Sequence, residues 1–295
     1  MHDQHATRSV VVGVVEAEGQ EQVALRAAHE ATRAGTGLRI MHAVEWPSPP
    51  DAAEAHTAGG TERAERTITH LSEAVHRQFP DLAVEQELVS GSPASALIHQ
   101  SAEAALIVVG HRGTGGFARL PLGSVSLQVA THSRCPVLVL RPTRGTEPSD
   151  NRVVVGVDVD DIQPHVMEFA LRAADSPGAW LEVVHASTRP ELLSTGPTGP
   201  LLVGHETRPI AAKELLEERL GPYRSRHPDV DIRTRVERGR PTNLLVESSR
   251  HAKVLVVGTH GRTGLRRLML GSVSGEVLHT AECPVVVVPP PVGEK

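Results

Sequence analysis

Glycines and a hydroxyl residue recur in this chain at a spacing that suits phosphate binding. Two glycines separated by two residues are followed, after nine more residues, by a Gly-Ser pair. Glycine lets a bound group approach the main chain, so several N–H groups can converge on one anion. A helix that begins at the Gly-Ser pair adds unpaired N–H groups and the positive end of its dipole. The pattern occurs twice, at Gly110, Gly113, Gly123 and Ser124 and at Gly258, Gly261, Gly271 and Ser272.

A plainer interpretation also fits a single copy of this pattern. The glycines would only shape tight turns, and each Ser would be an ordinary helix N-cap. The duplication favours phosphate binding, because residues 110–126 and 258–274 are identical at ten of seventeen positions, far more than the rest of the repeat. Similarity is therefore concentrated at the predicted phosphate cradle.

The elements around the first loop alternate between strands and helices, which predicts an α/β fold with a parallel sheet and helices on both faces. We expect five strands in the order 3-2-1-4-5 and a ligand at their carboxyl ends, where the winding direction reverses. A long loop is expected over Trp46–Gly60. The expected strands are Val10–Val15, Leu38–Val44, Leu82–Val89, Leu106–Val109 and Pro136–Leu140, and the expected helices are Gln20–Arg33, Glu62–Phe79, Ala94–Ala102 and one that follows Ser124.

The whole order of elements repeats in the second half of the chain. His42 returns as His185, an offset of 143 residues, and Pro80 returns as Pro228, an offset of 148. The five additional residues coincide with a longer loop at Ser187–Thr207. We therefore predict two tandem domains, residues 1–144 and 153–295, joined by a linker at 145–152.

Composition excludes several classes of partner. A formal net charge of -5 and an aromatic content of 2% argue against binding of nucleic acid. No signal peptide and no apolar run of roughly 20 residues is visible, so we expect a cytoplasmic protein without a membrane partner. Cys135 and Cys283 occupy matching Cys-Pro pairs in the two halves, and we interpret them as small buried side chains in a reducing compartment.

With these motifs the chain resembles the universal stress protein family in its tandem two-domain form, because the family's motif G-x2-G-x9-G-[S/T] is met in both halves. The resemblance implies Rossmann-like (HUP-type) domains that bind ATP and that pair through their last strands, within one chain or across a homodimer. It implies that the nucleotide is bound in the first half by Gly13, Ala43, Gly110, His111, Arg112, Gly113, Gly116, Gly123, Ser124, Val125 and Ser126, and in the second half by Gly156, Asp158, Ala186, Gly258, Thr259, His260, Gly261, Gly264, Gly271, Ser272, Val273 and Ser274.

The two halves differ at one residue that the resemblance implies for the nucleoside. The family usually has Asp two residues after the glycine of the first strand. The second half has Asp158 there, but the first half has Val15, which cannot accept a hydrogen bond. We therefore predict tighter ATP binding in the second half.

Catalytic machinery is less evident than binding machinery. Walker A and Gly-x-Ser-x-Gly patterns are absent. Asp158, Asp160 and Asp161 form either a capping turn or a water-mediated Mg²⁺ site, and we assign no metal ligands. Charge neutralisation and solvation are both open for the loop arginines, which are Arg112, Arg119, Arg262, Arg266 and Arg267.

We therefore expect a nucleotide-dependent regulatory protein with an unidentified protein partner, not an enzyme. ATP, with or without Mg²⁺, is the expected ligand. Two alternatives stay open. One is a slow ATPase or nucleotide-transfer enzyme, and the other is an interaction module whose nucleotide pockets are vestigial.

Overall fold

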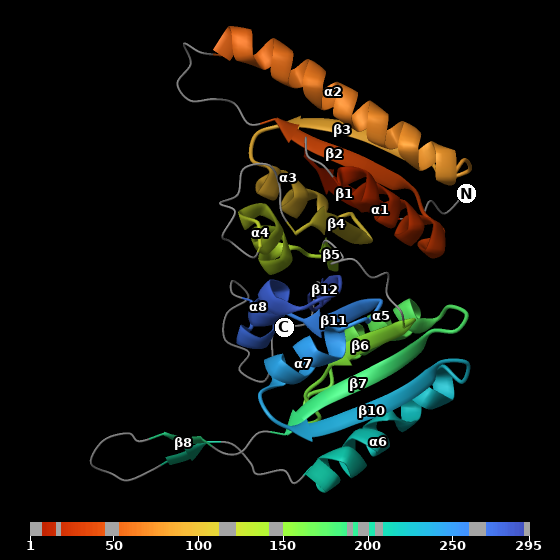
Figure 1. Cartoon of the computed structure of the whole chain (residues 1–295), viewed down its shortest axis with the longest axis vertical. Coiled ribbons are helices and arrows are strands. Elements are labelled where there is room, and N and C mark those ends of the chain that lie inside the picture. Colours follow the sequence, from red (N-terminus) through yellow and green to blue (C-terminus); the bar gives the residue numbers. More distant parts are fainter. Residues whose placement is uncertain are drawn as a thin grey trace, which may run out of the picture. The chain divides into compact units, whose positions relative to one another are not determined.

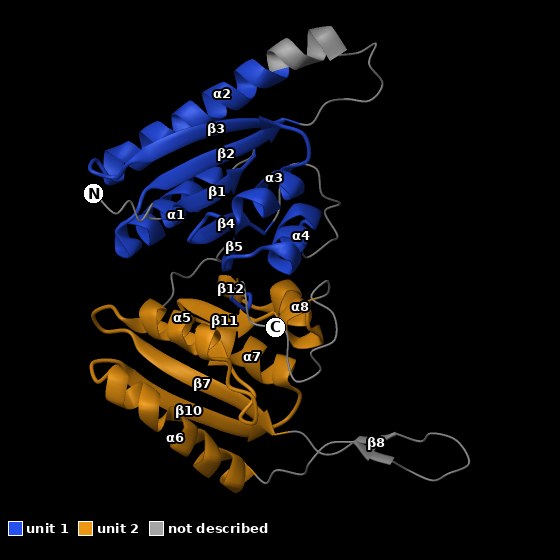
Figure 2. Ribbon diagram, turned by 180° about the vertical axis from the view of Figure 1, so that it is seen from behind, with its two compact units in different colours: residues 1–142, 289–295 blue, residues 143–288 orange. Residues whose placement is uncertain are grey.

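The computed structural model of the chain is shown in Figure 1. It contains two compact units, residues 1–142 with 289–295 and residues 143–288 (Figure 2). The structure describes residues 8–15, 19–44, 53–111, 122–141, 150–187, 191–193, 201–203, 209–259 and 270–291. Within these ranges only the main chain is described at 53–59, 191–193 and 201–203.

Unit 1 is an α/β domain with a parallel sheet. Its elements are β1 (Val10–Val14), α1 (Gln20–Ala34), β2 (Leu38–Val44), α2 (Ala53–Gln78), β3 (Val84–Ser90), α3 (Pro93–Gln100), β4 (Leu106–Gly110), α4 (Ser124–His132) and β5 (Val137–Leu140). The central strand β1 pairs with β2 and β4, while β3 lies beyond β2 and β5 lies beyond β4. The strand order is therefore 3-2-1-4-5.

The helices cover the sheet of unit 1 from both faces. From β1 the chain moves outward through α1 and α2 to β3, then returns through α3 to β4 and continues through α4 to β5. Right-handed crossovers place helices on opposite faces when the direction of travel reverses. Accordingly α1 packs beside α2, and α3 packs beside α4 (Figure 1).

The core of unit 1 is built around β1, which carries apolar side chains on both faces of the sheet. Val10, Val11 and Val12 are at most 1% exposed, as expected for a central parallel strand. Helix α1 faces this sheet with alanines, and Ala24 and Ala27 are completely buried. Small side chains let the helix approach the strands closely, so the carboxyl end of β1 is rigidly placed.

Unit 2 repeats this architecture. Its elements are β6 (Arg152–Gly156), α5 (Pro164–Ala174), β7 (Trp180–Ser187), β8 (Glu191–Leu193), β9 (Leu201–Val203), α6 (Pro209–Arg226), β10 (Asp231–Arg238), α7 (Pro241–Ser249), β11 (Val254–Gly258), α8 (Ser272–Thr280) and β12 (Val285–Val288). Parallel pairing gives β10-β7-β6-β11-β12. The antiparallel pair β8-β9 lies within the predicted loop Ser187–Thr207 and was not expected.

One expected loop is partly wrong. The sequence predicted a loop over Trp46–Gly60 and a helix from Glu62, whereas α2 begins at Ala53. Two adjacent glycines suggested a break, but each costs only about 1 kcal/mol in a helix, and the alanine-rich segment before them favours helix. Residues 46–52 of the predicted loop lie outside the described residues.

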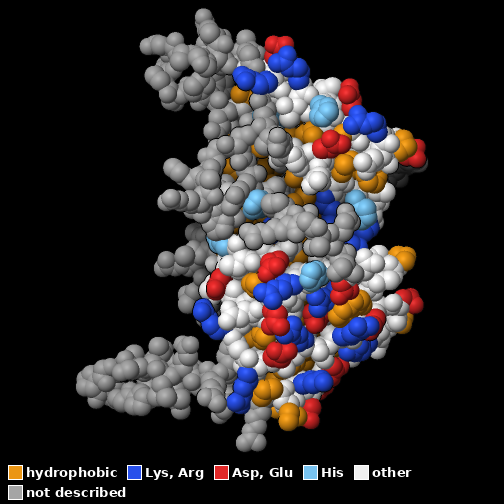
Figure 3. Space-filling view, viewed as in Figure 1, with side chains coloured by type: hydrophobic (Ala, Val, Ile, Leu, Met, Phe, Trp, Pro, Cys, Tyr) orange, Lys and Arg blue, Asp and Glu red, His pale blue; other side chains and the backbone are white. Residues whose placement is uncertain are grey.

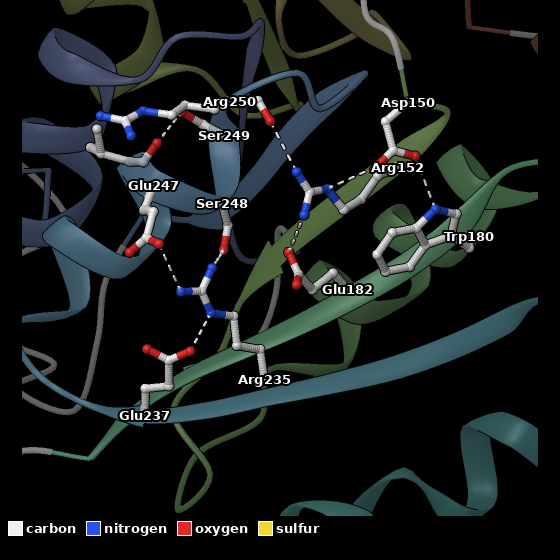
Figure 4. A network of polar contacts seen from close by, with 11 residues as sticks. Asp150, Arg152, Trp180, Glu182, Arg235, Glu237, Glu247, Ser248, Ser249 and Arg250 are labelled. Carbon is white, nitrogen blue, oxygen red and sulfur yellow. Dashed lines mark hydrogen bonds and ion pairs between the residues drawn. The ribbon is translucent and has the colours of Figure 1, made fainter.

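Polar contacts join α7 to the sheet of unit 2 (Figure 4). Arg235 of β10 donates to the hydroxyl of Ser248 at 3.1 Å and forms ion pairs with Glu237 at 2.7 Å and Glu247 at 3.2 Å. These contacts orient α7, whose Leu245 packs against the end of β6.

The same face carries a second group of contacts around Arg152 of β6 (Figure 4). This guanidinium lies 3.3 Å from the carboxylate of Glu182 on β7 and donates to the carbonyl oxygen of Arg250 at 2.9 Å. Its Cζ lies 5.6 Å from the ring centroid of Trp180. The residue after α7 is thereby joined to the central strand of the unit.

Candidate functional site

The carboxyl ends of two central strands meet at one edge of each sheet. In unit 1, β1 and β4 are parallel neighbours, and the chain leaves them in opposite directions, toward β2 and toward β5. Unit 2 has the same relation between β6 and β11. Ligands of open α/β sheets bind at such a reversal. Each glycine-rich loop starts there, after Gly110 of β4 or Gly258 of β11.

Main-chain hydrogen bonds close the base of each loop. The N–H of Gly123 donates to the carbonyl oxygen of His111 at 2.7 Å, and the N–H of Gly271 donates to that of Thr259, also at 2.7 Å. The strand end and the helix start are therefore adjacent in both units.

A buried serine forms a second bond at the same place. Ser126 Oγ donates to the carbonyl oxygen of Gly110, and Ser274 Oγ to that of Gly258, each at 2.6 Å. The two serines are 4% and 6% exposed. Both were predicted to hold outer phosphates. In this structure their hydroxyl protons are donated within the loop base, and the contact of these two residues with phosphate stays a prediction.

The helix starts leave N–H groups available. Helix α4 has Gly123 as its N-cap residue, and the first N–H that donates back to it is that of Leu127, at 3.0 Å. In α8 the same bond joins Gly275 to Gly271 at 2.8 Å. Within the described part of the chain, the three N–H groups between these residues have no partner. Each helix thus starts beside the sheet edge with three N–H groups that no described residue accepts and with the positive end of its dipole.

The interpretation of Ser124 and Ser272 as N-caps is wrong. The cap residue is the preceding glycine, with φ −70° at Gly123 and −58° at Gly271, and neither helix has a side-chain cap bond. Both serines are exposed at the first helical position, and Val125 and Val273 behind them are half-buried. The two glycines do not need a positive φ, so the absence of a side chain there is consistent with close approach of a ligand.

Helix packing explains the glycines near the ends of the central strands. A Cβ on Gly13 would lie 2.7 Å from Leu97 Cδ1 of α3, and a Cβ on Gly156 would lie 2.9 Å from Leu245 Cδ1 of α7. Both glycines were predicted to contact the nucleotide. In this structure their small size is required by the leucine that packs on them.

On the other side of the site, a Cβ on Gly258 would lie 2.7 Å from Gln163 Oε1. Gln163 precedes α5, and the offset of 143 residues makes it the equivalent of Gln20. Gln20 is 7% exposed, and its Oε1 accepts the N–H of Val15 at 3.4 Å. The sequence did not predict either glutamine near the site, although their repetition was visible.

The turn after β6 is ordered by Asp158. Its Oδ1 accepts the N–H of Asp160 at 3.2 Å, and its carbonyl oxygen accepts the N–H of Asp161 at 3.0 Å. These bonds form the turn that the three acids predicted, but the turn does not cap α5, whose N-cap residue is Gln163 without a side-chain cap bond. Across the residues with described positions, no three His, Cys, Asp or Glu side chains lie close enough to hold a metal ion.

A buried histidine that the sequence did not single out lies beneath this turn. His185 is 6% exposed and its Nδ1 lies 3.2 Å from the carbonyl oxygen of Val157 and 3.3 Å from the N of Val159. The sequence signal that could have identified it is the histidine at the equivalent position of the first half, His42, which is 7% exposed. The predicted contacts Ala43 and Ala186 follow these histidines and are half-buried.

Much of each predicted loop lies outside the described residues, 112–121 in unit 1 and 260–269 in unit 2. The nucleotide contacts predicted there are Arg112, Gly113, Gly116, His260, Gly261 and Gly264, and the loop arginines there are Arg112, Arg119, Arg262, Arg266 and Arg267.

Both cysteines are buried, as the sequence predicted. Cys135 and Cys283 are 3% and 4% exposed and form no disulfide. Burial raises the pKa of the Cys135 thiol, and its contact with the Ser133 hydroxyl opposes this only in part. A thiol of this kind packs as a small apolar side chain.

Charges of both signs alternate on the described surface of unit 2. Figure 3 shows Lys and Arg side chains next to Asp and Glu side chains over this unit. Many are paired, for example Arg233 with Asp231 at 2.7 Å and Arg224 with Glu217 at 3.0 Å. The described surface of unit 2 therefore carries acidic and basic side chains in close pairs.

The protein is a tandem α/β protein with two Rossmann-like domains. Each domain has a glycine-rich loop between the fourth strand of its parallel sheet and the following helix. The chain belongs to the universal stress protein family, whose model matches residues 6–141 and 151–289.

Similar proteins span the whole length of the chain. A universal stress protein of Mycolicibacterium smegmatis is 30% identical over 300 residues, which cover 97% of this chain and 99% of that protein. One of Mycobacterium tuberculosis is 33% identical over 291 residues, covering 94% and 96%. A solved universal stress protein from Archaeoglobus fulgidus has a TM-score of 0.69 at 17% identity and covers 96% of this chain and 99% of its own. This last similarity concerns the fold.

In the described ranges, no helix combines the length and apolarity that crossing a bilayer requires.

Proposed function

We propose that this protein binds ATP at the glycine-rich loop of unit 2 and acts as a nucleotide-dependent regulatory protein. The observation that carries the proposal is the start of α8, where three N–H groups with no partner among the described residues lie beside the carboxyl end of β11, at the reversal point of the sheet. Amide donors at a helix N-terminus are a general site for phosphate. The hydrogen bonds that Gly271 and Ser274 make to the end of β11 support it, because they fix the position of these donors.

Unit 1 has the same main-chain donors but differs at the nucleoside end. Asp158 follows β6, and a carboxylate has two oxygens with several acceptor positions, one of which accepts the N–H of Asp160. Val15 takes this place in unit 1 and offers no side-chain acceptor. We therefore propose that ATP binds more tightly to unit 2, because ribose hydroxyls need an acceptor once water is removed.

The test begins with nucleotide released from gently purified protein and identified by mass spectrometry. Isothermal titration then compares the full chain with Gly271→Ala and Gly123→Ala, counting sites per chain. Both glycines have φ values that alanine adopts, so the changes add a methyl group beside the amide donors without backbone strain.

Gly271→Ala is expected to abolish the tighter site, Gly123→Ala to spare it, and Asp158→Ala to weaken it about tenfold. Equal losses from Asp158→Ala and Gly123→Ala would contradict the ranking of the two units. Absence of ATP binding to the unmodified chain would leave an interaction module with vestigial pockets.

We further propose that the protein binds ATP without a catalytic function. The described residues at the loop bases and helix starts are glycine, serine, valine, leucine, threonine and His111, and His111 has no histidine at the equivalent position, Thr259. A turnover assay with and without Mg²⁺ tests this, with Gly271→Ala as the control. Hydrolysis that Gly271→Ala removes would overturn the proposal and identify the site as a slow ATPase.

A further inference from the structure

The side chain of His185 links β7 to the turn after β6, one residue beyond the last main-chain pairing of these two strands. The last ladder contacts pair Gly156 of β6 with Val184 of β7, and the N–H of Val157 donates to the carbonyl oxygen of Val184 at 3.0 Å. The next residue of β7 is His185, whose side chain continues the connection. Its Nδ1 lies within hydrogen-bond distance of the main chain on both sides of Asp158.

Either neutral form of the imidazole makes one bond to this turn. With the proton on Nε2, Nδ1 accepts the N–H of Val159 at 3.3 Å, and with the proton on Nδ1 it donates to the carbonyl oxygen of Val157 at 3.2 Å. The ring is 6% exposed, so water competes little for the bond. An aliphatic side chain of similar size would leave both main-chain groups without this partner.

The side chain of Val159, the residue after Asp158, also holds this turn in place. Val159 is completely buried, while Asp160 and Asp161 are exposed. Asp158 thus lies between two groups, Val157 and Val159, that the core and His185 hold in place. The conformation of the turn decides where the carboxylate of Asp158 lies relative to a ligand.

The main chain on the other side of His185 is also part of the proposed site. Ala186 follows directly at the carboxyl end of β7 and is half-buried. We infer that His185 is a positioning residue that fixes Asp158 and the β7 end together at the nucleoside end of the unit 2 site. This inference rests on the proposed binding of ATP, and it assigns His185 to the nucleoside and not to the phosphates.

Unit 1 contains a matched control. His42 has the equivalent position on β2 and is 7% exposed, but Val15 stands where unit 2 has Asp158, and the side chain of Val15 has no acceptor to position. Loss of the His42 imidazole is therefore expected to change folding stability only, because unit 1 has no carboxylate at this position that could bind the nucleoside.

The experiment uses the full chain with His185→Leu, His185→Asn and His42→Leu. Asparagine can place either an acceptor or a donor near the position of Nδ1, so it is the conservative variant. Isothermal titration measures dissociation constants for ATP and for inorganic tripolyphosphate, which has no nucleoside. Amide hydrogen exchange over residues 157–161 reports the order of the turn without any ligand.

We expect His185→Leu to weaken ATP binding about tenfold, to change tripolyphosphate binding less than about twofold, and to accelerate exchange over residues 157–161, in line with the loss of one buried hydrogen bond. His185→Asn should restore most of both effects, and His42→Leu should leave ATP binding at unit 2 unchanged. Equal losses for ATP and tripolyphosphate, or unchanged ATP binding in His185→Leu, would overturn the inference while the proposed function stands. If the unmodified chain does not bind ATP, both fail.

Discussion

Ser274 Oγ donates a hydrogen bond to the carbonyl oxygen of Gly258, with 2.6 Å between the two oxygens. This bond joins the first turn of α8 to the last residue of β11, and the same bond joins Ser126 to Gly110 in unit 1. A serine that the motif suggested as a phosphate ligand is thus part of the framework that holds the amide donors. The distinction between these two roles can be measured.

Ser274→Ala should lower the free energy of unfolding by about 1 to 3 kcal/mol, because the carbonyl oxygen of Gly258 loses the donor that the buried Ser274 side chain provides. It should also weaken ATP binding, since the start of α8 is less firmly placed. Ser126→Ala is the matched control, with a similar loss of stability and little change at the tighter site. Urea unfolding and isothermal titration check the two effects. A large loss of ATP affinity in Ser274→Ala with unchanged stability would instead favour direct phosphate contact.

Gly156→Ala should destabilise unit 2 by about 1 to 3 kcal/mol through overpacking, because the new Cβ would lie 2.9 Å from Leu245 Cδ1 and 3.0 Å from Cδ2. The contact atoms are the ends of a leucine side chain, so shortening that side chain should relieve the crowding. The double variant Gly156→Ala with Leu245→Val should therefore be more stable than the sum of the single changes predicts. Strictly additive losses in urea unfolding would show that Leu245 is not the reason for glycine at this position.

The local pattern of the sequence was sufficient for the strands, for most helices and for the position of the two loops. Apolar runs such as Val10–Val14 are local signals for strands. The glycines at the ends of β4 and β11 are local signals too, and they place the loop after the fourth strand of each five-stranded sheet. The parallel α/β class follows from the alternation of elements. The early start of α2 and the pair β8-β9 were missed, because weak local preferences decide them.

The site was predicted less completely, since its geometry depends on contacts between distant residues. Leu97 explains Gly13, although 84 positions separate them, and nothing local to either residue indicates the contact. The bond from Ser126 to Gly110 spans 16 positions and likewise needs the fold. His185 was visible only as a repeated residue type. Sequence therefore identified which segments form the site, while packing determined what each side chain does there.

Glu30 of α1 should make the stability of unit 1 depend on pH. Burial raises the pKa of this carboxyl group, but the guanidinium groups of Arg26 and Arg33 outweigh burial, so its pKa lies below the usual value. Arg26 Nε lies 3.0 Å and Arg33 Nη2 lies 2.9 Å from the carboxylate. A lowered pKa contributes stability above the pKa of the unfolded state, and this contribution is lost as pH falls through the folded-state pKa.

Glu30→Gln should therefore lower the free energy of unfolding by about 1 kcal/mol at neutral pH and by progressively less toward the acid limit of folding. Glu21→Gln on the same helix removes the same charge from a half-exposed side chain and serves as the control. Urea unfolding across this pH range provides the measurement. A deficit of Glu30→Gln that stays constant with pH would show that ionisation of Glu30 does not contribute.

Cross-strand charges are reversed between the two units. Arg39 of β2 lies opposite Glu85 of β3 and forms an ion pair with it at 2.9 Å, with Glu87 at 3.6 Å. In unit 2 the acid is on the inner strand, and Glu182 of β7 lies opposite Arg233 of β10. The fold therefore accepts either polarity when opposite charges face each other.

Arg39→Glu alone should destabilise unit 1 by about 1 to 2 kcal/mol, because like charges would then face each other across two pairs. The triple reversal Arg39→Glu, Glu85→Arg and Glu87→Arg should recover most of this loss, since it gives unit 1 the polarity of unit 2. Gln100, which accepts from Arg39 and donates to Glu87 at 3.0 Å, can exchange its amide donor and acceptor to fit both arrangements. Urea unfolding at low and high salt separates the charge effect from packing. A triple variant no more stable than Arg39→Glu would mean that packing of the arginine stem, and not its charge, stabilises this face.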